Sequence, residues 1–325
     1  MDVEFDLVAR IRERATARDD VVLGIGDDAA ILRIPPGHDL VVSTDTLNIG
    51  VHFPPETAPS DIGWKALAVN LSDLAAMGAQ PAWCTLNLAM PQADRGWLDA
   101  FLDGFLALAA LHEVALVGGD TTRGPLSITV TVHGFVPQGS ELRRGGAQVG
   151  DLVCVTGCLG NAAGALRQWQ VGIPAHSTMH PFLTRPTPRI GLGLALRGLA
   201  TACIDISDGL LADLSHILST SNVGAEIEYA EIPTAAILKV KFDAIEQREL
   251  ILNGGDDYEL CFTVPPERAT EVIAATDHIN VPYRRIGRIE AQPGLRLREV
   301  DGRIHAVSPR GYQHFGMSPK GEASA

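Results

Sequence analysis

Six acidic clusters, each beside glycine or a small hydroxyl residue, constrain the fold and function of this chain more than any other feature. They are Gly26-Asp27-Asp28, Ser43-Thr44-Asp45-Thr46, Asn70-Leu71-Ser72-Asp73, Gly118-Gly119-Asp120-Thr121-Thr122, Asp205-Ile206-Ser207-Asp208-Gly209 and Gly254-Gly255-Asp256-Asp257. Carboxylates packed so densely repel one another unless cations neutralise them. A single Gly-Asp pair is best explained as a turn. Six clusters, most of them after apolar runs, favour a cation-binding site instead.

The ligand chemistry of these clusters favours magnesium. Carboxylate and hydroxyl oxygens are hard ligands, and Mg²⁺ in enzymes usually arrives with phosphates. The first hypothesis is therefore a Mg²⁺-dependent enzyme that acts on a nucleotide or a phosphate. The sequence contains no Walker motif, and Gly24-Ile25-Gly26 is followed by Asp27-Asp28 instead of completing a dinucleotide-binding fingerprint. Any nucleotide site here is of a less common, metal-rich kind.

Length and patterning indicate two α/β or α+β domains. The chain has 325 residues, and its hydrophobic content of 46% supports a full core. Predicted strands and helices alternate in both halves. A Gly- and Arg-rich stretch separates them, so we expect an N-terminal domain over residues 1–137 and a linker over 138–149. A C-terminal domain over 150–317 and a flexible tail over 318–325 follow.

The clearest local prediction is a helix over residues 61–77. Its apolar residues recur at helical spacing and include Trp64, Leu67, Leu71 and Leu74, and Gly78 ends it. Short apolar runs predict strands on either side of this helix. These strands cover residues 21–25, 40–44, 82–90, 114–117 and 127–136.

Charge and hydropathy exclude several classes of protein. The formal net charge of −13 argues against non-specific binding to nucleic acid. The first residues are acidic instead of basic, so no signal peptide is expected. Charged residues interrupt the most apolar stretches, which makes a membrane span improbable. We therefore expect a cytoplasmic protein with no membrane partner.

Several carboxylates stand where ligands commonly bind. Asp45 follows the predicted strand over 40–44, and its neighbours Ser43 and Thr44 add further oxygens. Asp73 lies three residues after Asn70 on the predicted helix, so these two side chains share a face.

Backbone groups and cations in three other segments suit phosphate. Gly118 and Gly119 allow amides to approach an anion closely, and Asp120 would hold the metal that shares it. Ser207 lies between Asp205 and Asp208 at the start of a predicted helix, where amides favour anions. Arg144, in the linker, is placed to reach a phosphate.

In their order along the chain, these motifs resemble those of the thiamine-monophosphate kinases, within the wider aminoimidazole-ribonucleotide-synthetase superfamily. The match extends over nearly the whole chain. Besides the acidic clusters it includes His52-Phe53, Lys65-Ala66-Leu67-Ala68-Val69, Asp256-Asp257-Tyr258-Glu259-Leu260 and Gly311-Tyr312-Gln313-His314-Phe315.

The resemblance implies a fold and a reaction. The reaction is transfer of the γ-phosphoryl group of ATP to thiamine monophosphate, giving thiamine diphosphate with the help of several Mg²⁺ ions. The implied fold has two α/β domains, and the implied assembly is a homodimer. The N-terminal mixed sheets with their helices associate into a barrel, and the C-terminal domain is an α/β sandwich.

The resemblance also implies roles for individual residues. The implied metal ligands are Asp28, Ser43, Thr44, Asp45, Asp73, Asp120, Asp205 and Asp208, with Asp45, Asp73 and Asp120 central to catalysis. The implied ATP contacts are Gly118, Gly119, Asp120, Arg144 and Ser207, and the implied thiamine-side contacts are His52, Glu259 and Phe315.

Two alternatives remain open. One is another ATP-using member of the superfamily, such as an aminoimidazole ribonucleotide synthetase. A selenophosphate synthetase fits less well, since it needs a reactive N-terminal cysteine and the first cysteine here is Cys84. The other alternative is a non-catalytic module that binds divalent cations or nucleotides.

Overall fold

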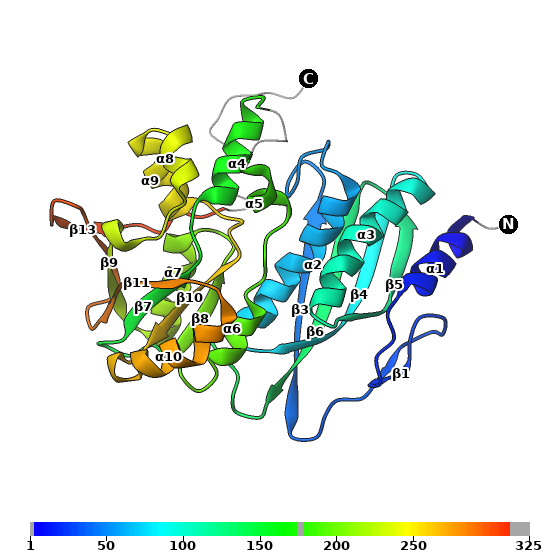
Figure 1. Cartoon of the computed structure of the whole chain (residues 1–325), viewed down its shortest axis with the longest axis horizontal. Coiled ribbons are helices and arrows are strands. Elements are labelled where there is room, and N and C mark those ends of the chain that lie inside the picture. Colours follow the sequence, from blue (N-terminus) through cyan, green and yellow to red (C-terminus); the bar gives the residue numbers. More distant parts are fainter. Residues whose placement is uncertain (1–2, 174–177, 313–325) are drawn as a thin grey trace.

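The computed structural model describes residues 3–173 and 178–312 and shows two sheets side by side (Figure 1). The first half of the chain builds a four-stranded sheet and the second half builds a seven-stranded sheet. Helices pack against both, which confirms the expected mixed α/β class. The helix α2 (Pro59–Ala76) lies between the two sheets (Figure 1).

The four-stranded sheet has the order β3-β6-β4-β5. Its strands are β3 (His38–Asn48), β4 (Gln80–Met90), β5 (Ala115–Arg123) and β6 (Ser127–Pro137). The pair β4 and β5 is parallel and the other two pairs are antiparallel. Beside this sheet lie α1 (Val3–Arg14), α3 (Arg95–Leu111) and a small hairpin of β1 (Val21–Leu23) and β2 (Ile31–Leu32).

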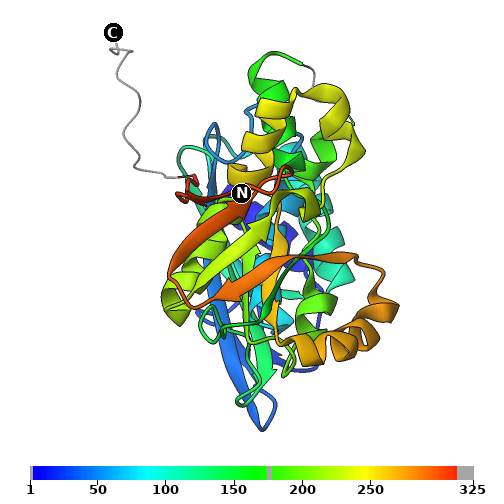
Figure 2. The same ribbon diagram turned by 90° about the vertical axis from the view of Figure 1, so that its left-hand side faces the viewer.

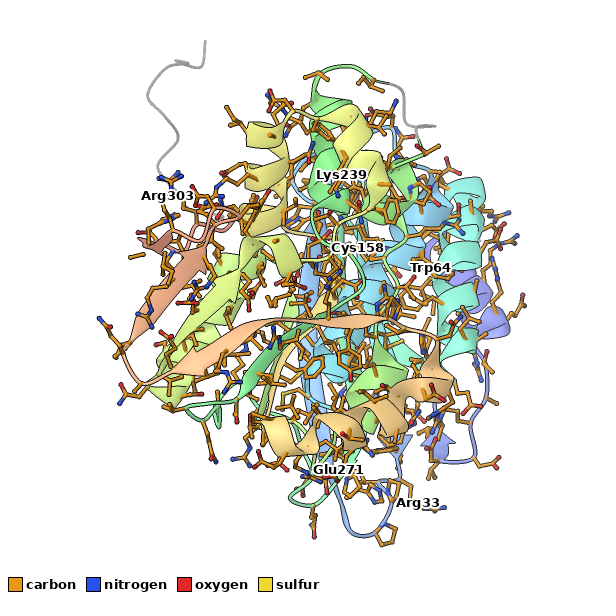
Figure 3. All side chains as sticks on the ribbon, turned by 60° about the vertical axis from the view of Figure 1, so that its left-hand side comes forward. Arg33, Trp64, Cys158, Lys239, Glu271 and Arg303 are labelled. Atoms are coloured by element: carbon orange, nitrogen blue, oxygen red, sulfur yellow. The ribbon has the colours of Figure 1, made fainter. Side chains whose placement is uncertain are left out.

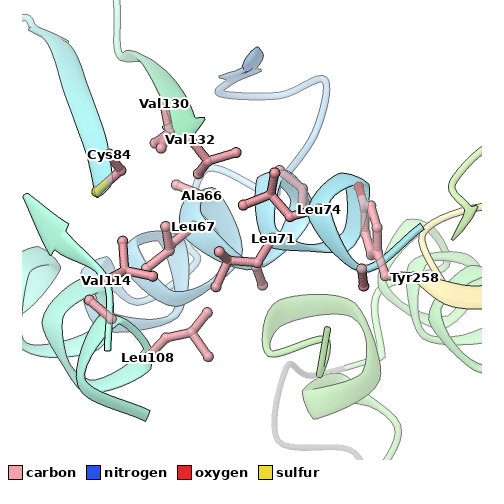
Figure 4. Close-up of a cluster of buried hydrophobic side chains, with 14 of the residues drawn as sticks. Ala66, Leu67, Leu71, Leu74, Cys84, Leu108, Val114, Val130, Val132 and Tyr258 are labelled. Carbon is pink, nitrogen blue, oxygen red and sulfur yellow. The ribbon is translucent and has the colours of Figure 1, made fainter. Parts of the chain in front are cut away.

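The helix α2 forms where its periodicity predicts. Pro59 occupies the first turn, where its missing N–H costs no hydrogen bond, and Gly78 follows the end at a φ of +61°. Figure 4 shows Leu67, Leu71 and Leu74 on the face of α2 that is buried in the core. The helix is thus fixed against the sheet, and its polar positions 70, 72 and 73 face other partners.

Two predicted strands are longer in the structure than in the sequence-based expectation. We expected the strand over 114–117 to end before the Gly-Gly-Asp motif, but β5 continues through this motif and pairs with β4 as far as Arg123. Gly119 has a φ of +145°, and a Cβ there would collide with the backbone of Leu86. The glycine therefore serves close pairing with β4. Similarly, β3 runs to Asn48, so Asp45 lies within the strand and not after it.

The seven-stranded sheet has the order β13-β12-β9-β11-β7-β10-β8 and faces the viewer in Figure 2. Its strands are β7 (Leu152–Thr156), β8 (Ala202–Ile206), β9 (Gly224–Glu228), β10 (Glu259–Val264), β11 (Tyr283–Glu290), β12 (Gly294–Arg298) and β13 (Ile304–Val307). The α-helices of this half are α4 (Asn161–Gln170), α5 (His180–Thr184), α6 (Ile190–Ala195), α7 (Leu210–Ser221), α8 (Ala236–Lys241), α9 (Ala244–Asn253) and α10 (Ala269–Thr276). Short 3₁₀ turns follow at η1 (Tyr229–Glu231), η2 (Pro266–Arg268) and η3 (Asp277–Ile279).

One hydrophobic cluster extends across both halves, beside a second cluster that lies within the C-terminal half. The cluster that holds Leu67 and Leu71 of α2 also contains Leu260 and Phe262 of β10, and Tyr258 joins it beside α2 (Figure 4). Apolar burial across the boundary disfavours free movement of one half against the other. Within the described ranges, no helix is both long and apolar enough to span a membrane.

Candidate functional site

The strand β3 and the helix α2 bring two acidic clusters together. The Ser43 hydroxyl donates to Oδ2 of Asp73 at 2.5 Å, and the Asp45 amide donates to Oδ1 of Asn70 at 2.9 Å. Asn70 and Asp73 are nearly one helical turn apart, so one end of α2 reaches two positions on the strand. The expected shared face of these two residues is thus directed at β3.

The third contribution comes from β8 in the other sheet. The Ser72 hydroxyl donates to Oδ2 of Asp205 at 2.7 Å, and both side chains are buried. Burial and, after it, the charge of Asp73 raise the pKa of Asp205 to about 8. Asp205 therefore lies close enough to Asp73 for the two carboxylates to repel each other.

Asp45 belongs to the same cluster. Its side chain is exposed to solvent, yet the surrounding protein partly desolvates its carboxylate. Desolvation, followed by the charges of Asp73 and Asp208, raises the pKa of Asp45 to about 6. Asp45, Asp73, Asp205 and Asp208 thus form a group of carboxylates close enough together to repel one another, which we call the acidic cluster.

A cleft of about 670 Å³ opens beside the acidic cluster. Ser43, Asp73 and Asp205 line it together with Arg143 and Arg144. Burial raises the pKa of Asp73, whereas the Ser43 hydrogen bond and the charge of Arg144 oppose that shift. Arg144 therefore lies near the carboxylates, and the cleft carries charged groups of both signs.

The turn between β8 and α7 differs from the expected anion site. The amides of Ser207, Asp208 and Gly209 all donate to Oδ2 of Asp213, at 3.1, 3.0 and 3.0 Å. An internal carboxylate thus takes the place of the anion that we expected at this helix start. Asp213 was not predicted as a partner of these amides, although it lies one helical turn after the Asp208-Gly209 pair in the sequence.

Asp28, Gly118 and Gly119 lie elsewhere. Residues 24–30 line a cavity of about 1160 Å³ with Gly118, Gly119 and Arg12. Asp120 lines an adjoining cavity of about 90 Å³ next to Gly119. This group belongs to β5 and the loop after β1, on the far side of the four-stranded sheet from β3.

The strand register shows how far apart the two groups are. Asp45 pairs with Val130, Val130 with Leu86, and Leu86 with Gly119, which precedes Asp120. Three strand spacings of about 4.8 Å separate these rows by roughly 14 Å. Within one chain, Asp45 and Asp120 therefore cannot bind the same ion.

The cleft has oxygen ligands suited to a metal ion, but they are not arranged as a preformed metal site in the described residues. In the part of the chain that the structure describes, no three acidic, histidine or cysteine side chains stand at metal-binding spacing. The Thr44 hydroxyl bonds to the Val130 carbonyl at 3.1 Å and to the Thr131 hydroxyl at 3.0 Å. Carboxylate and hydroxyl oxygens are ligands that a hard divalent cation prefers. The raised pKa values of Asp45, Asp73 and Asp205 show that negative charge is crowded at this place.

The expected thiamine-side residues are dispersed around α2 and β10. His52 lies in the turn after β3, where its Nδ1 accepts the Asn48 amide at 2.9 Å. Glu259 is buried at the start of β10, where Arg189 binds both of its oxygens and the Thr156 hydroxyl donates at 2.5 Å. Arg189 already neutralises the Glu259 carboxylate. Phe315 lies outside the described residues.

Comparison with known proteins gives consistent relatives. The chain matches the N-terminal domain of AIR synthase related protein over residues 26–136 and the C-terminal domain over residues 148–299. It is 46% identical over 318 residues to the thiamine-monophosphate kinase of Escherichia coli (strain K12), covering 96% of this chain and 98% of that one. It is 45% identical over 319 residues to the enzyme of Salmonella typhimurium, with the same coverage.

Solved structures agree with these relatives. Thiamine-monophosphate kinase from Stenotrophomonas maltophilia K279a is 51% identical with a TM-score of 0.86, over 92% of this chain and 96% of that one. AaThiL, complexed with AMPPCP and TMP, is 31% identical with a TM-score of 0.77, over 96% of each chain. The hydrogenase maturation protein HypE, at 19% identity and a TM-score of 0.77, shows the shared fold alone.

Proposed function

Because this chain belongs to the thiamine-monophosphate kinase family, we propose that it transfers the γ-phosphoryl group of ATP directly and in line to thiamine monophosphate, giving thiamine diphosphate. The observation that carries the proposal is the full-length similarity to a relative that was solved with both AMPPCP and TMP. The acidic cluster beside Arg144 adds the local chemistry that two phosphate-bearing substrates need.

The acceptor itself needs little activation. A phosphate monoester has a second pKa of about 6, so its oxygens are largely ionised near neutral pH. No strong general base is then required. The obstacle is that two polyanions must approach each other, and the residues of the site have to reduce that repulsion.

Magnesium fits the donor set of the acidic cluster. Ser43, Thr44, Asp45, Asp73, Asp205 and Asp208 would hold ions on the β3 side, and Asp28 and Asp120 would hold ions on the β5 side. When bound, Mg²⁺ supplies positive charge that screens the phosphates and stabilises the transition state. Asp45, Asp73 and Asp120 place that charge, while Gly118, Gly119, Arg144 and Ser207 bind ATP, Ser207 through its hydroxyl because its amide donates to Asp213. His52, Glu259 and Phe315 contact the thiamine side.

The separation of the two acidic groups supports a homodimer. Asp45 lies on β3 and Asp120 on β5, the opposite edges of the four-stranded sheet. A second copy that joins the two sheets into a barrel would bring Asp45 beside Asp120 of the partner subunit. We therefore place the complete site at a subunit boundary of a cytoplasmic homodimer, with residues 1–137 forming the barrel, 138–149 the linker and 150–317 the α/β sandwich.

The acceptor decides between this proposal and its alternatives. ADP release with Mg²⁺–ATP is measured with thiamine monophosphate, thiamine or aminoimidazole precursors supplied separately. Release with thiamine monophosphate alone supports the kinase. Release with another acceptor alone would assign the chain to a sibling activity, and binding of ATP without release would indicate a binding module.

A further inference from the structure

The lysine on α2 is buried although it carries a charge. Lys65 is 1% exposed, and of the fully buried side chains that the structure describes, only that of Trp83 is larger. A buried ammonium is costly unless it is paired and hydrogen-bonded. Its Nζ donates to Oδ2 of Asp256 at 3.0 Å and to the His52 carbonyl oxygen at 3.0 Å. One charge thus connects two segments that are far apart in the sequence.

The segment that contains Asp256 has an unusual backbone conformation. Asp256 and Tyr258 have φ values of +67° and +50°, which are rare for residues other than glycine. The Asp256 amide donates to the Ser207 carbonyl and the Tyr258 amide to the Ile206 carbonyl, both at 2.8 Å. The Tyr258 hydroxyl also donates to Oδ1 of Asp256 at 3.0 Å. Asp256 is therefore fixed to the end of β8, where the acidic cluster lies.

The second segment is the turn that carries His52. The His52 amide donates to the Asn48 carbonyl at 3.0 Å, and the Gly50 amide donates to the Phe53 carbonyl at 2.9 Å. These local bonds shape the turn but do not place it relative to the C-terminal sheet. The Lys65 ammonium does so, because it holds the turn through His52 and the other half of the chain through Asp256.

We propose that Lys65 is a positioning residue that, through Asp256, holds the His52 turn in register with the acidic cluster, so that His52 meets the thiamine end of the acceptor while the phosphate end meets the carboxylates. The inference rests on the proposed function, since it uses the thiamine-side role of His52. It adds a residue that sets the fit of the acceptor without touching it.

Kinetics of Lys65→Met test the proposal. The variant keeps the aliphatic stem and loses the ammonium, so we expect the KM for thiamine monophosphate to rise about tenfold while kcat and the KM for Mg²⁺–ATP stay within about twofold. The matched control is Lys239→Met, because Lys239 is exposed on α8 (Figure 3) and should change neither constant. A lysine that only supported folding would lower the amount of active enzyme without a selective change in KM.

A double variant tests the connection itself. Asp256→Asn should raise the same KM, and Lys65→Met with Asp256→Asn should be no worse than Lys65→Met alone, because both changes break one link. If the two increases in KM for thiamine monophosphate multiply in the double variant, Lys65 does not act through Asp256. If Lys65→Met does not fold, Asp256→Asn with the Lys239→Met control decides the KM prediction.

Hydrogen exchange gives a readout that does not depend on activity. Amides of residues 48–53 should exchange at least several-fold faster in Lys65→Met than in wild type, with α3 amides unchanged. Unchanged exchange, or an unchanged KM for thiamine monophosphate in a folded variant, would overturn the proposal. A wild-type protein that turns over no thiamine monophosphate would refute the proposed function instead, and exchange would then decide the Lys65 link by itself.

Discussion

The Ser72 hydroxyl on α2 donates to Oδ2 of Asp205 on β8 at 2.7 Å, in a place where both side chains are buried. This bond joins the helix that covers the four-stranded sheet to the edge strand of the seven-stranded sheet. It therefore fixes the distance between carboxylates that come from the two halves of the chain. The acidic cluster depends on the contact between the halves as much as on either half.

Ser72→Ala should lower stability more than an ordinary serine change. A buried carboxyl group that loses its donor costs about 1 to 3 kcal/mol in the free energy of unfolding. Urea unfolding measures the loss. Ser215→Ala is the control, because the Ser215 hydroxyl donates to the Ala212 carbonyl of its own helix. Equal losses in the two variants would show that the bond to Asp205 adds nothing.

Asp45→Asn and Asp120→Asn should each reduce turnover about 100-fold or more, since each removes charge that places the metal. Folding stability should change little. Removal of the Asp45 charge relieves repulsion in the acidic cluster, so its free energy of unfolding should not fall. Asp39→Asn is the control on the same strand, because Asp39 is exposed. Near-normal turnover with an unchanged Mg²⁺ requirement would contradict the assignment.

Glu259→Gln should affect both stability and acceptor binding. The Arg189 guanidinium, whose side chain is 20% exposed, would lose its charged partner. We expect a loss of about 2 kcal/mol in the free energy of unfolding, less than for a fully buried pair. The KM for thiamine monophosphate should rise and that for ATP should not. Glu271→Gln, at an exposed ion pair, should leave both properties unchanged. A selective rise in the KM for ATP would contradict the assignment of Glu259 to the thiamine monophosphate side.

Mixed subunits test the site at the subunit boundary. In a dimer of one Asp45→Asn and one Asp120→Asn subunit, one of the two sites keeps both carboxylates. An equal mixture of the two inactive variants, unfolded and refolded together, should therefore recover about a quarter of wild-type turnover. Separately refolded variants serve as the baseline. Recovery no greater than this baseline would mean that both carboxylates of a site come from one chain.

Much of the fold followed from local patterns in the sequence. The apolar face of α2 and its end at Gly78 predicted that helix within two residues at each end. The strands β11 to β13 were not predicted, because β11 and β12 carry arginines, β13 has only 4 residues, and all three gain their stability from pairing with neighbours. The length of β5 was also underestimated. Two glycines resemble a turn in sequence, whereas close pairing with β4 keeps them in a strand.

Residues that act through tertiary contacts were harder to recognise. Asp213 resembles a solvated helix charge in sequence, yet three backbone amides converge on it. Lys65 lies within the matching helix motif, but its role depends on the distant Asp256. Spacing along the chain suggested which carboxylates carry chemistry. It did not reveal that Asp45 and Asp120 stand at opposite edges of one sheet.

The most direct test of the account follows the transferred phosphoryl group. ATP that carries ¹⁸O in its γ-phosphate is incubated with Mg²⁺, thiamine monophosphate and the wild-type protein. The products are separated, and ³¹P NMR shows which phosphate carries the ¹⁸O label. We expect one label in the terminal phosphate of thiamine diphosphate for each ADP formed. Label released as inorganic phosphate, with thiamine monophosphate unchanged, would contradict it.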